Sequence, residues 1–301
     1  DFTLVCSGSN EATVTATFRN TGIDQQSNFM VSYQLDSEPA IQETFTGNLP
    51  SGQQAAFSFT TPLVLPANGT YNLTVSVGLA GDQDSSNDEV DATIFVLLDA
   101  TAVDFQETFE VNGFPPPAWF VHNPDGSITW QEQPNITGVD GNPTTTAFLN
   151  NYLYSASGQM DDFITEVFDL TSSGIADLSF DLAKAQHSSN RFDSMRVEAS
   201  IDCGATYTTI YDKTDLDLST LPGYINFNWA PSGADDWRTE FIDLAGYVGE
   251  YVMFRFVNTN GEGNNTFVDN INVTAEALGV DENDFNTSIM MYPNPASEEV
   301  I

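Results

Sequence analysis

The sequence predicts an all-β chain that folds as two successive β-sandwiches and ends in an extended tail. Residues 1–275 consist of short runs in which apolar and polar residues alternate, and Gly, Asn, Asp and Pro separate these runs. No long stretch there has the apolar spacing of an amphipathic helix. The 22 Phe, 10 Tyr and 4 Trp residues supply enough apolar surface for real cores, so the chain is not a disordered acidic segment.

The first sandwich is expected over residues 1–98. In the run 28–36, Phe29, Val31 and Leu35 lie an even number of positions apart and therefore share one face of a strand. Turn residues, such as the Asn-Gly pair at 68–69, separate the runs. Short strands at this spacing are typical of an immunoglobulin-like sandwich. The expected strands are 13–20, 28–36, 40–47, 53–60, 71–80 and 89–98.

Several motifs in residues 1–98 resemble those of the CARDB-type immunoglobulin-like modules of secreted bacterial proteins. The resemblance implies a spacer or adhesion unit. The motifs are Cys-Ser at 6–7, FRNTG at 18–22, VSYQLD at 31–36, and Gly-Asp at 81–82 with Asn-Asp at 87–88.

The second sandwich is expected over residues 105–275, because 251–256 and 267–273 alternate clearly and many turn residues separate the runs. Its opening at 107–119 is similar to the start of MAM-like jelly-roll modules, called choice-of-anchor J or cleaved-adhesin domains. The resemblance implies a jelly-roll β-sandwich. Further matching motifs follow in the expected order at 161–170, 178–182, 193–197, 200–207, 236–244 and 267–271.

Residues 276–301 read as an acidic linker and the start of a sorting domain. Each proline of Tyr292-Pro293-Asn294-Pro295 fixes its own φ and biases the preceding residue toward an extended conformation. This motif resembles the opening of the type A C-terminal sorting domain of type IX secretion cargo. The resemblance implies recognition by the secretion machinery of a Bacteroidetes-type bacterium and a secreted or outer-cell-surface location. It also implies that the chain is the C-terminal piece of a larger protein.

Charge excludes some partners. The chain has 43 acidic and 7 basic residues, a net charge of −36, which repels nucleic acid and anionic lipid and attracts divalent cations. No run of about 18 apolar residues is present, so we expect no membrane insertion.

Catalytic motifs are not evident. The two histidines, His122 and His187, belong to no His-Glu-x-x-His run, and the chain has no Gly-x-Ser-x-Gly elbow or phosphate loop. A Ser-His-Asp triad or a carboxylate pair remains formally open, but so many acids make a pair uninformative. We therefore expect a non-catalytic accessory, adhesion or spacer region. The alternatives are a carbohydrate- or protein-binding module, or the accessory region of a larger secreted protease or glycan hydrolase.

Two carboxylates are predicted to face the core of the second sandwich. Period-two spacing places Glu107 with its flanking phenylalanines, and Asp269 with Phe267, Ile271 and Val273. Their strands open and close the domain, and such strands can be neighbours in a jelly roll. A buried carboxylate needs a partner or must be neutralised, and Ca²⁺ suits oxygen-rich sites.

A structural Ca²⁺ is therefore expected, and related jelly-roll modules commonly carry one. The resemblance adds Glu110 as a ligand, and Asp162 is a weaker candidate. The alternative is that these acids lie at strand ends, or bond to the backbone, to Arg238 or to Arg255.

A ligand-binding face is expected near the loop 228–233. Trp229, Tyr224 and Trp237 could stack on sugar rings, with Asn and Asp bonding to the hydroxyls, so a glycan or a surface protein is a possible partner. The alternative is that these aromatic residues pack in the core.

Cys6 and Cys203 lie in different predicted domains, and a disulfide between them is not expected. Cys6 is left to pair with a residue preceding this chain, and Cys203 to be a small buried thiol.

Overall fold

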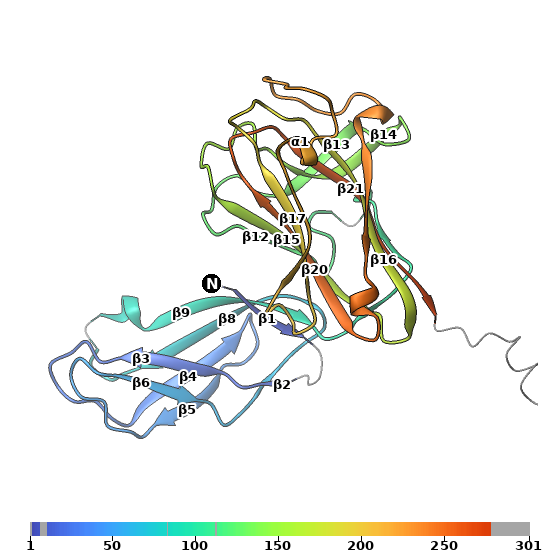
Figure 1. The fold of residues 1–301 in the computed structure, drawn as a ribbon. Coiled ribbons are helices and arrows are strands. Elements are labelled where there is room, and N and C mark those ends of the chain that lie inside the picture. The colour runs from blue at the N-terminus through green and yellow to red at the C-terminus, as the bar shows by residue number, and fades with distance from the viewer. Residues whose placement is uncertain (1, 7–10, 83, 112, 278–301) are drawn as a thin grey trace, which may run out of the picture.

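The computed structural model describes residues 2–6, 11–82, 84–111 and 113–277, and it confirms an all-β fold (Figure 1). The described strands pair within residues 2–97 or within 101–277. The predicted linker and the motif at 292–295 lie outside the described residues. No helix in the described part of the chain is long and apolar enough to cross a membrane.

The first sandwich is built around a five-stranded sheet with the order β1-β9-β8-β4-β5. β1 runs parallel to β9, and the other pairings are antiparallel. Two short antiparallel pairs, β3 with β6 and β2 with β7, accompany it. The strands are β1 (Phe2–Cys6), β2 (Glu11–Ala12), β3 (Thr15–Arg19), β4 (Phe29–Leu35), β5 (Ile41–Phe45), β6 (Gln54–Ser58), β7 (Leu63–Val64), β8 (Gly69–Gly78) and β9 (Glu89–Leu97).

Alternation in β4 has the predicted result. Phe29, Val31, Tyr33 and Leu35 are buried, while the residues between them are more exposed. The Tyr33 hydroxyl donates a hydrogen bond of 3.1 Å to the carbonyl of Thr61, which satisfies its polar end inside the core.

The second sandwich has two six-stranded sheets. The β15 sheet has the order β10-β15-β20-β17-β18, with β12 also on β15; the β21 sheet has the order β13-β14-β21-β16-β19, with β11 also on β21. The strands are β10 (Thr101–Ala102), β11 (Phe105–Glu107), β12 (Phe120–His122), β13 (Gln131–Thr137), β14 (Pro143–Leu149), β15 (Met160–Asp169), β16 (Ser173–Lys184), β17 (Ser194–Ser200), β18 (Thr208–Thr214), β19 (Arg238–Asp243), β20 (Tyr251–Thr259) and β21 (Thr266–Ala277).

The opening and closing strands of this sandwich lie side by side, as predicted. β11 pairs with β21 in antiparallel register, with Glu107 opposite Ile271. A large core between the two sheets contains the buried rings of Phe163, Phe168 and Phe254. Helical turns are short: η1 (Ser85–Asn87), α1 (Asp215–Leu218), η2 (Ala234–Asp236) and η3 (Ala245–Tyr247).

A second apolar cluster covers the other face of the β21 sheet. Phe148 and Phe267 point to this outer face, and the loop between α1 and β19 lays Trp229 and Trp237 over them. The loop therefore acts as a partial third layer, and its edge forms the site described below.

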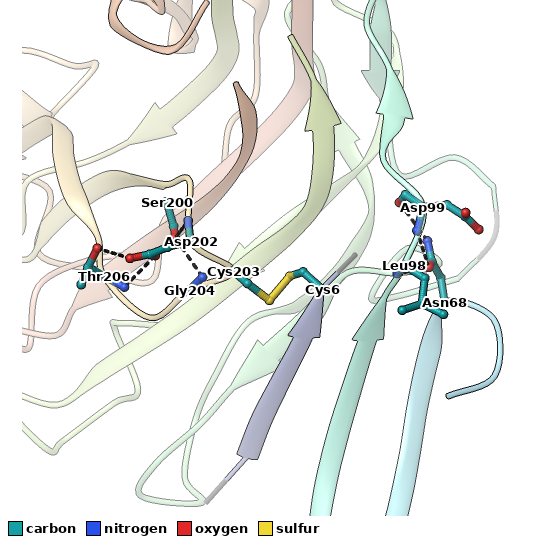
Figure 2. The surroundings of a disulfide bond; sticks show 9 residues. All are labelled: Cys6, Asn68, Leu98, Asp99, Ser200, Asp202, Cys203, Gly204 and Thr206. Carbon is teal, nitrogen blue, oxygen red and sulfur yellow. Dashed lines mark hydrogen bonds between the residues drawn. A yellow bond between two sulfur atoms is a disulfide. The ribbon is translucent and has the colours of Figure 1, made fainter. Parts of the chain in front are cut away.

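The two cysteines form a disulfide, so the expectation that they would not pair is wrong. Cys6 ends β1 and Cys203 lies in the turn between β17 and β18, and their Cα atoms are 5.6 Å apart (Figure 2). The prediction failed because it treated the two domains as separate units. Since β1 runs parallel beside β9, its end arrives at the junction with the second sandwich.

An apolar interface supports this covalent link. Phe95 and Leu97 of β9 form one cluster with Phe120, Ile164 and Met253 of the β15 sheet, and Cys6 packs against it. The two sandwiches are thus joined by the Cys6–Cys203 disulfide and by a shared buried cluster, in addition to the short connecting segment 98–100 (Figure 1).

Candidate functional site

A groove of about 290 Å³ opens on the outer face of the β21 sheet. Its floor and sides come from β13, β14 and the start of β21, and the loop that carries Trp229 closes one side. Its lining is Gln131, Gln133, Ile136, Phe148, Asn150, Asn228, Trp229, Ala230, Asn265 and Phe267. We call this the amide groove, because every polar side chain that lines it is an amide.

The apolar base of the amide groove is fixed by packing. Trp229 meets the ring of Phe267 edge-on, with centroids 6.0 Å apart and planes at 81°, and Phe148 lies 4.9 Å from Phe267. All three side chains are buried. Aromatic rings in such contacts are held rigidly, so the base does not have to reorganise when a ligand arrives.

Asn264 positions the loop beside the groove. Its side-chain amide donates to the carbonyls of Ile225 (2.8 Å) and Phe227 (3.0 Å), and its side-chain oxygen accepts from the N–H of Trp229 (3.3 Å). Asn265 then donates to the carbonyl of Trp229 at 2.8 Å. The loop is therefore pinned at several backbone positions by two buried amide side chains.

A buried ion pair supports Asn264 in turn. Lys184 Nζ donates to Asp193 Oδ2 and to the carbonyl of Asn264, and both charged side chains are almost fully buried. Asp193 also accepts the N–H groups of Gly261 (2.8 Å) and Gly263 (3.1 Å). Burial lowers the pKa of Lys184, and the Asp193 carboxylate opposes that shift.

The outer part of the amide groove is accessible. Gln131 and Asn228 are exposed, and Gln133 and Asn150 are half-buried. A primary amide carries both donors and an acceptor, so these side chains can bond to hydroxyl groups in either direction. None of the lining residues is ionisable, so the groove contains no general acid, base or nucleophile.

The three aromatic residues predicted to bind ligand are placed differently. Trp229 lines the groove but is 6% exposed, so it offers an edge of its ring and not a free platform. Tyr224 is 55% exposed and does not line the groove. Trp237 is buried, and its Nε1 donates to the carbonyl of Thr137 at 2.7 Å, which is a structural role.

Sequence reasoning placed a ligand face near the loop that begins at Asn228, but it missed the other amides of the groove. Gln131 and Gln133 occupy alternate positions of one strand, which is the one local signal that they share a face. Asn150 reaches them because β14, which it follows, pairs with β13. Nothing in the sequence indicates that Asn228 joins them, because the folding of the long loop between α1 and β19 brings it there.

Two of the predicted metal ligands, Glu110 and Asp269, meet at Thr144. The Thr144 hydroxyl lies 2.8 Å from Glu110 Oε1 and 2.9 Å from Asp269 Oδ2, and Glu110 also accepts the N–H of Thr145 at 2.7 Å. Burial is the main cause that raises the pKa of Asp269 to about 7, and the carboxylates of Asp181 and Glu110 add to it. We call Glu110, Asp181, Asp269 and Thr144 the acid cluster.

Glu107 lies on the opposite face of the β21 sheet, which corrects the predicted face of Asp269. Asn270 has a φ of 48°, and the pairing of β16 with β21 shifts register beside it. This bulge reverses the alternation, so Ile271 belongs to the core between the sheets while Phe267 belongs to the outer cluster. Asp269 therefore shares a face with Phe267 and not with Ile271.

Glu107 and Asp162 have other partners. Glu107 accepts the N–H of Phe109 at 2.5 Å and is close enough to Glu166 to raise the pKa of that residue. Asp162 lies 3.1 Å from His122 Nδ1 and 3.6 Å from Arg255 Nη1. The structure thus brings together Glu110 and Asp269, and it places Glu107 and Asp162 elsewhere.

The donor set of the acid cluster fits a hard cation. Its atoms are carboxylate and hydroxyl oxygens, which Ca²⁺ prefers, and the groups that contact the buried Asp269 side chain within the described residues are Thr144 and Asn270, neither of which is basic. Within the described ranges, no three His, Cys, Asp or Glu side chains converge closely enough to hold a metal by themselves. A bound ion would therefore need neutral oxygens such as that of Thr144.

Comparisons with known proteins concern the fold. No family model matches the chain, and no curated protein matches it. The K1 cleaved adhesin domain of Lys-gingipain from Porphyromonas gingivalis W83 is 20% identical, over 57% of this chain and 98% of that domain, with a TM-score of 0.42. A family 22 carbohydrate-binding module of Clostridium thermocellum Xyn10B is 14% identical, over 61% and 99%, with a TM-score of 0.35. The chain is an all-β protein with β-sandwich neighbours.

Proposed function

We propose that this chain is a non-catalytic adhesion module that binds a neutral carbohydrate in the amide groove. The observation that carries the proposal is the lining of the groove, which combines a rigid aromatic base with amide side chains and has no ionisable group. Amides pair with sugar hydroxyls, and the apolar base covers the C–H face of a ring. The volume is near the lower end of the roughly 300–1,000 Å³ of ligand sites, which suits a short saccharide segment.

The wider setting is also part of the proposal. We expect a secreted protein, or one held at the outer cell surface of a Bacteroidetes-type bacterium. The tail motif at 292–295, which resembles a type IX sorting domain, would be read by the secretion machinery. The joined sandwiches would then serve a larger protein, such as a secreted protease or glycan hydrolase, as an accessory or spacer region.

We further propose that Ca²⁺ occupies the acid cluster. Glu110, Asp269 and the Thr144 oxygen would hold it, and Asp181 would add negative charge beside it. The ion would neutralise the buried Asp269 carboxylate and tie β14 to β21, which together form part of the amide groove.

Glycan arrays followed by calorimetry test the binding proposal. Gln131→Ala and Gln133→Ala should each weaken binding of the best neutral glycan by about tenfold, the cost of roughly one good hydrogen bond. Gln106→Ala is the matched control, because Gln106 is exposed on β11 and outside the groove. Trp229→Ala is unsuitable, since it removes a buried ring. Failure of the wild type to bind any neutral glycan would refute the proposal.

Thermal unfolding of the protein in Ca²⁺ and in EDTA tests whether an ion occupies the acid cluster. Ca²⁺ at about 100 times the Kd of the acid cluster should stabilise the wild type by about 2.7 kcal/mol through that site, and Asp269→Asn should lose most of this contribution. The exposed Asp177→Asn on β16 is the matched control. Equal gains in Asp269→Asn and the wild type would contradict occupancy of the acid cluster.

A further inference from the structure

A second group of buried oxygens lies on the face of β15 that points into the core between the two sheets. Asp161 is 0% exposed, and neither of its carboxylate oxygens has a hydrogen-bond partner. It shares a face of β15 with Phe163, two positions away, whose ring belongs to the core between the sheets. A buried carboxylate without a donor or a cation is costly, so this position needs an explanation.

Two other oxygens beside Asp161 are also unsatisfied. Asn123 Oδ1 and Thr129 Oγ1 are buried and have no hydrogen-bond partner. β12 lies beside β15 (Figure 1), and their antiparallel pairing ends with His122 opposite Asp162. Asn123 follows His122 directly, and Asp161 is the next position along β15 in that direction. The indole N–H next to Thr129, that of Trp130, donates to the Asp161 carbonyl at 3.1 Å. Two segments, β15 and residues 123–129, therefore carry the buried unpaired oxygens of Asp161, Asn123 and Thr129.

The segment 123–129 wraps this place with further oxygens. Asp125 Oδ2 accepts the hydroxyl of the buried Tyr154 at 2.9 Å, and Asp125 Oδ1 accepts the N–H of Ser127 at 2.9 Å. Asn123 Nδ2 donates to the carbonyl of Ser127 at 2.9 Å. Its side-chain donor is thus turned toward the loop, which leaves its oxygen as the group available to a ligand.

The local charge is negative. Burial is the main cause that raises the pKa of Asp161 to about 6, and the carboxylates of Asp125 and Asp162 add to it. The hydroxyls of Thr129 and Tyr154 are near enough to lower the pKa of Asp161 in part, although neither makes a hydrogen bond of normal geometry to its carboxylate. The charged groups that act on Asp161 are thus carboxylates. Arg255 is held by Asp162 and Glu198, on the other face of the sheet.

We propose that the Asp161 carboxylate, Asn123 Oδ1 and Thr129 Oγ1 bind a Ca²⁺ ion, with Asp125 as the second acid beside it. All of these are hard oxygen donors, and the group contains no thiol or imidazole that would favour a transition metal. The ion would neutralise the buried carboxylate and fix the segment 123–129 over the open end of the core. Bound water would satisfy the oxygens but would leave the charge uncompensated.

This site is separate from the acid cluster. Asp161 lies between the sheets and is carried by the β15 sheet, whereas Asp269 lies on the outer face of the β21 sheet. The two sites share no residue. The wild-type chain is therefore expected to bind one Ca²⁺ through Asp161 in addition to any ion at the acid cluster.

The test is calcium titration of the calcium-stripped full chain by calorimetry and native mass spectrometry. Asp161→Asn should abolish one binding event or weaken it by more than about tenfold, the loss that even outer-shell partners can cause. Asp177→Asn, an exposed acid on β16, is the matched control and should bind as the wild type does. Tb³⁺ emission sensitised through Trp130 should fall in Asp161→Asn and persist in the control.

Two further variants separate the possible outcomes. Thr129→Val keeps the shape of the side chain and the acid while removing one oxygen donor, so it should weaken the same event if Asp161→Asn does not fold. Asp269→Asn should leave the Asp161 event intact, which distinguishes this proposal from an ion at the acid cluster. Unchanged stoichiometry and affinity in both Asp161→Asn and Thr129→Val would overturn the proposal and leave water or a protonated carboxyl at this place.

Discussion

The ring of Phe95 stacks on the ring of Phe120, with centroids 4.1 Å apart and planes 15° from parallel. Phe95 belongs to the last strand of the first sandwich and Phe120 to the second sandwich, so this contact lies at their junction. Both rings are buried in the cluster that contains Leu97, Ile164 and Met253. The junction is therefore packed like a core, which favours a fixed arrangement of the two sandwiches over a flexible one.

Phe120→Ala should strongly destabilise the protein. Removing a buried Phe ring typically costs about 3–5 kcal/mol, because apolar contacts are lost and a cavity remains. The free energy of unfolding in urea measures this loss. The control is Phe241→Ala, since Phe241 is 76% exposed and its change should cost less than about 0.5 kcal/mol. Similar losses in the two variants would show that the junction is not packed in solution.

Replacing both cysteines with Ser should lower the free energy of unfolding by about 2–5 kcal/mol, the usual cost of losing a native disulfide. The bond joins residues 197 positions apart, so it constrains the unfolded chain widely. Treatment of the wild type with a reductant should give a similar loss, and the double variant should not respond. A thiol assay on denatured, unreduced protein provides the check: two reactive thiols per chain would contradict the bond.

Glu166 should make stability fall as the pH rises. Burial is the main cause that raises its pKa, and Glu107 adds to this, although Thr101 and Trp119 donate hydrogen bonds to its carboxylate. The folded protein therefore keeps this proton to a higher pH than the unfolded chain does. Stability from this group is full below the unfolded pKa of about 4.5 and is lost as the pH rises through the folded pKa.

Glu166→Gln removes this titration. Relative to the wild type, the variant should gain stability as the pH rises from about 4.5 and level off above the folded pKa of Glu166. Urea unfolding across this range measures the difference. Glu132→Gln, at an exposed position of β13, is the control and should follow the wild type. Parallel curves for Glu166→Gln and the wild type would show that the carboxyl titrates normally.

Lys184→Met should cost about 3–5 kcal/mol, because it leaves the buried Asp193 charge without its cation. Amide exchange in the loop 225–229 should also become faster, since Asn264 would lose the support of Lys184. Lys213→Met is the control: Lys213 also pairs with a glutamate, Glu240, but is 31% exposed, so its loss should cost about 1 kcal/mol or less. An equally small effect at Lys184 would argue against the buried pair.

The local alternation of apolar and polar residues predicted strands well where no long-range contact changed the face of a strand. The alternation of Phe29, Val31 and Leu35 gave both the strand β4 and its buried face. The same reasoning placed Glu107 and Asp269 in neighbouring strands, which the structure confirms. It failed to predict which face Asp269 occupies. The bulge at Asn270 has a positive φ, and the sequence has no glycine at that position to indicate it.

Contacts between residues far apart in the sequence could not be predicted from the local alternation of apolar and polar residues. The pairing of Cys6 with Cys203 depends on how two domains pack, and the groove depends on how the loop with Asn228 lies over β13 and β14. Asp161 and Asp162 are adjacent in the sequence, and choosing between them requires knowing which one faces the core. Burial and unpaired oxygens reveal that difference, and neither can be read from residue order.

The Cys6–Cys203 bond also decides how the molecule transmits tension. If the chain is pulled at a point before residue 6 and at a point after residue 203, the shortest covalent path runs through the two sulfur atoms. The residues between them, which include the whole of the first sandwich from β2 to β9, then form a side loop that is not stretched. Under such tension the first sandwich would stay folded for as long as the bond stays oxidised.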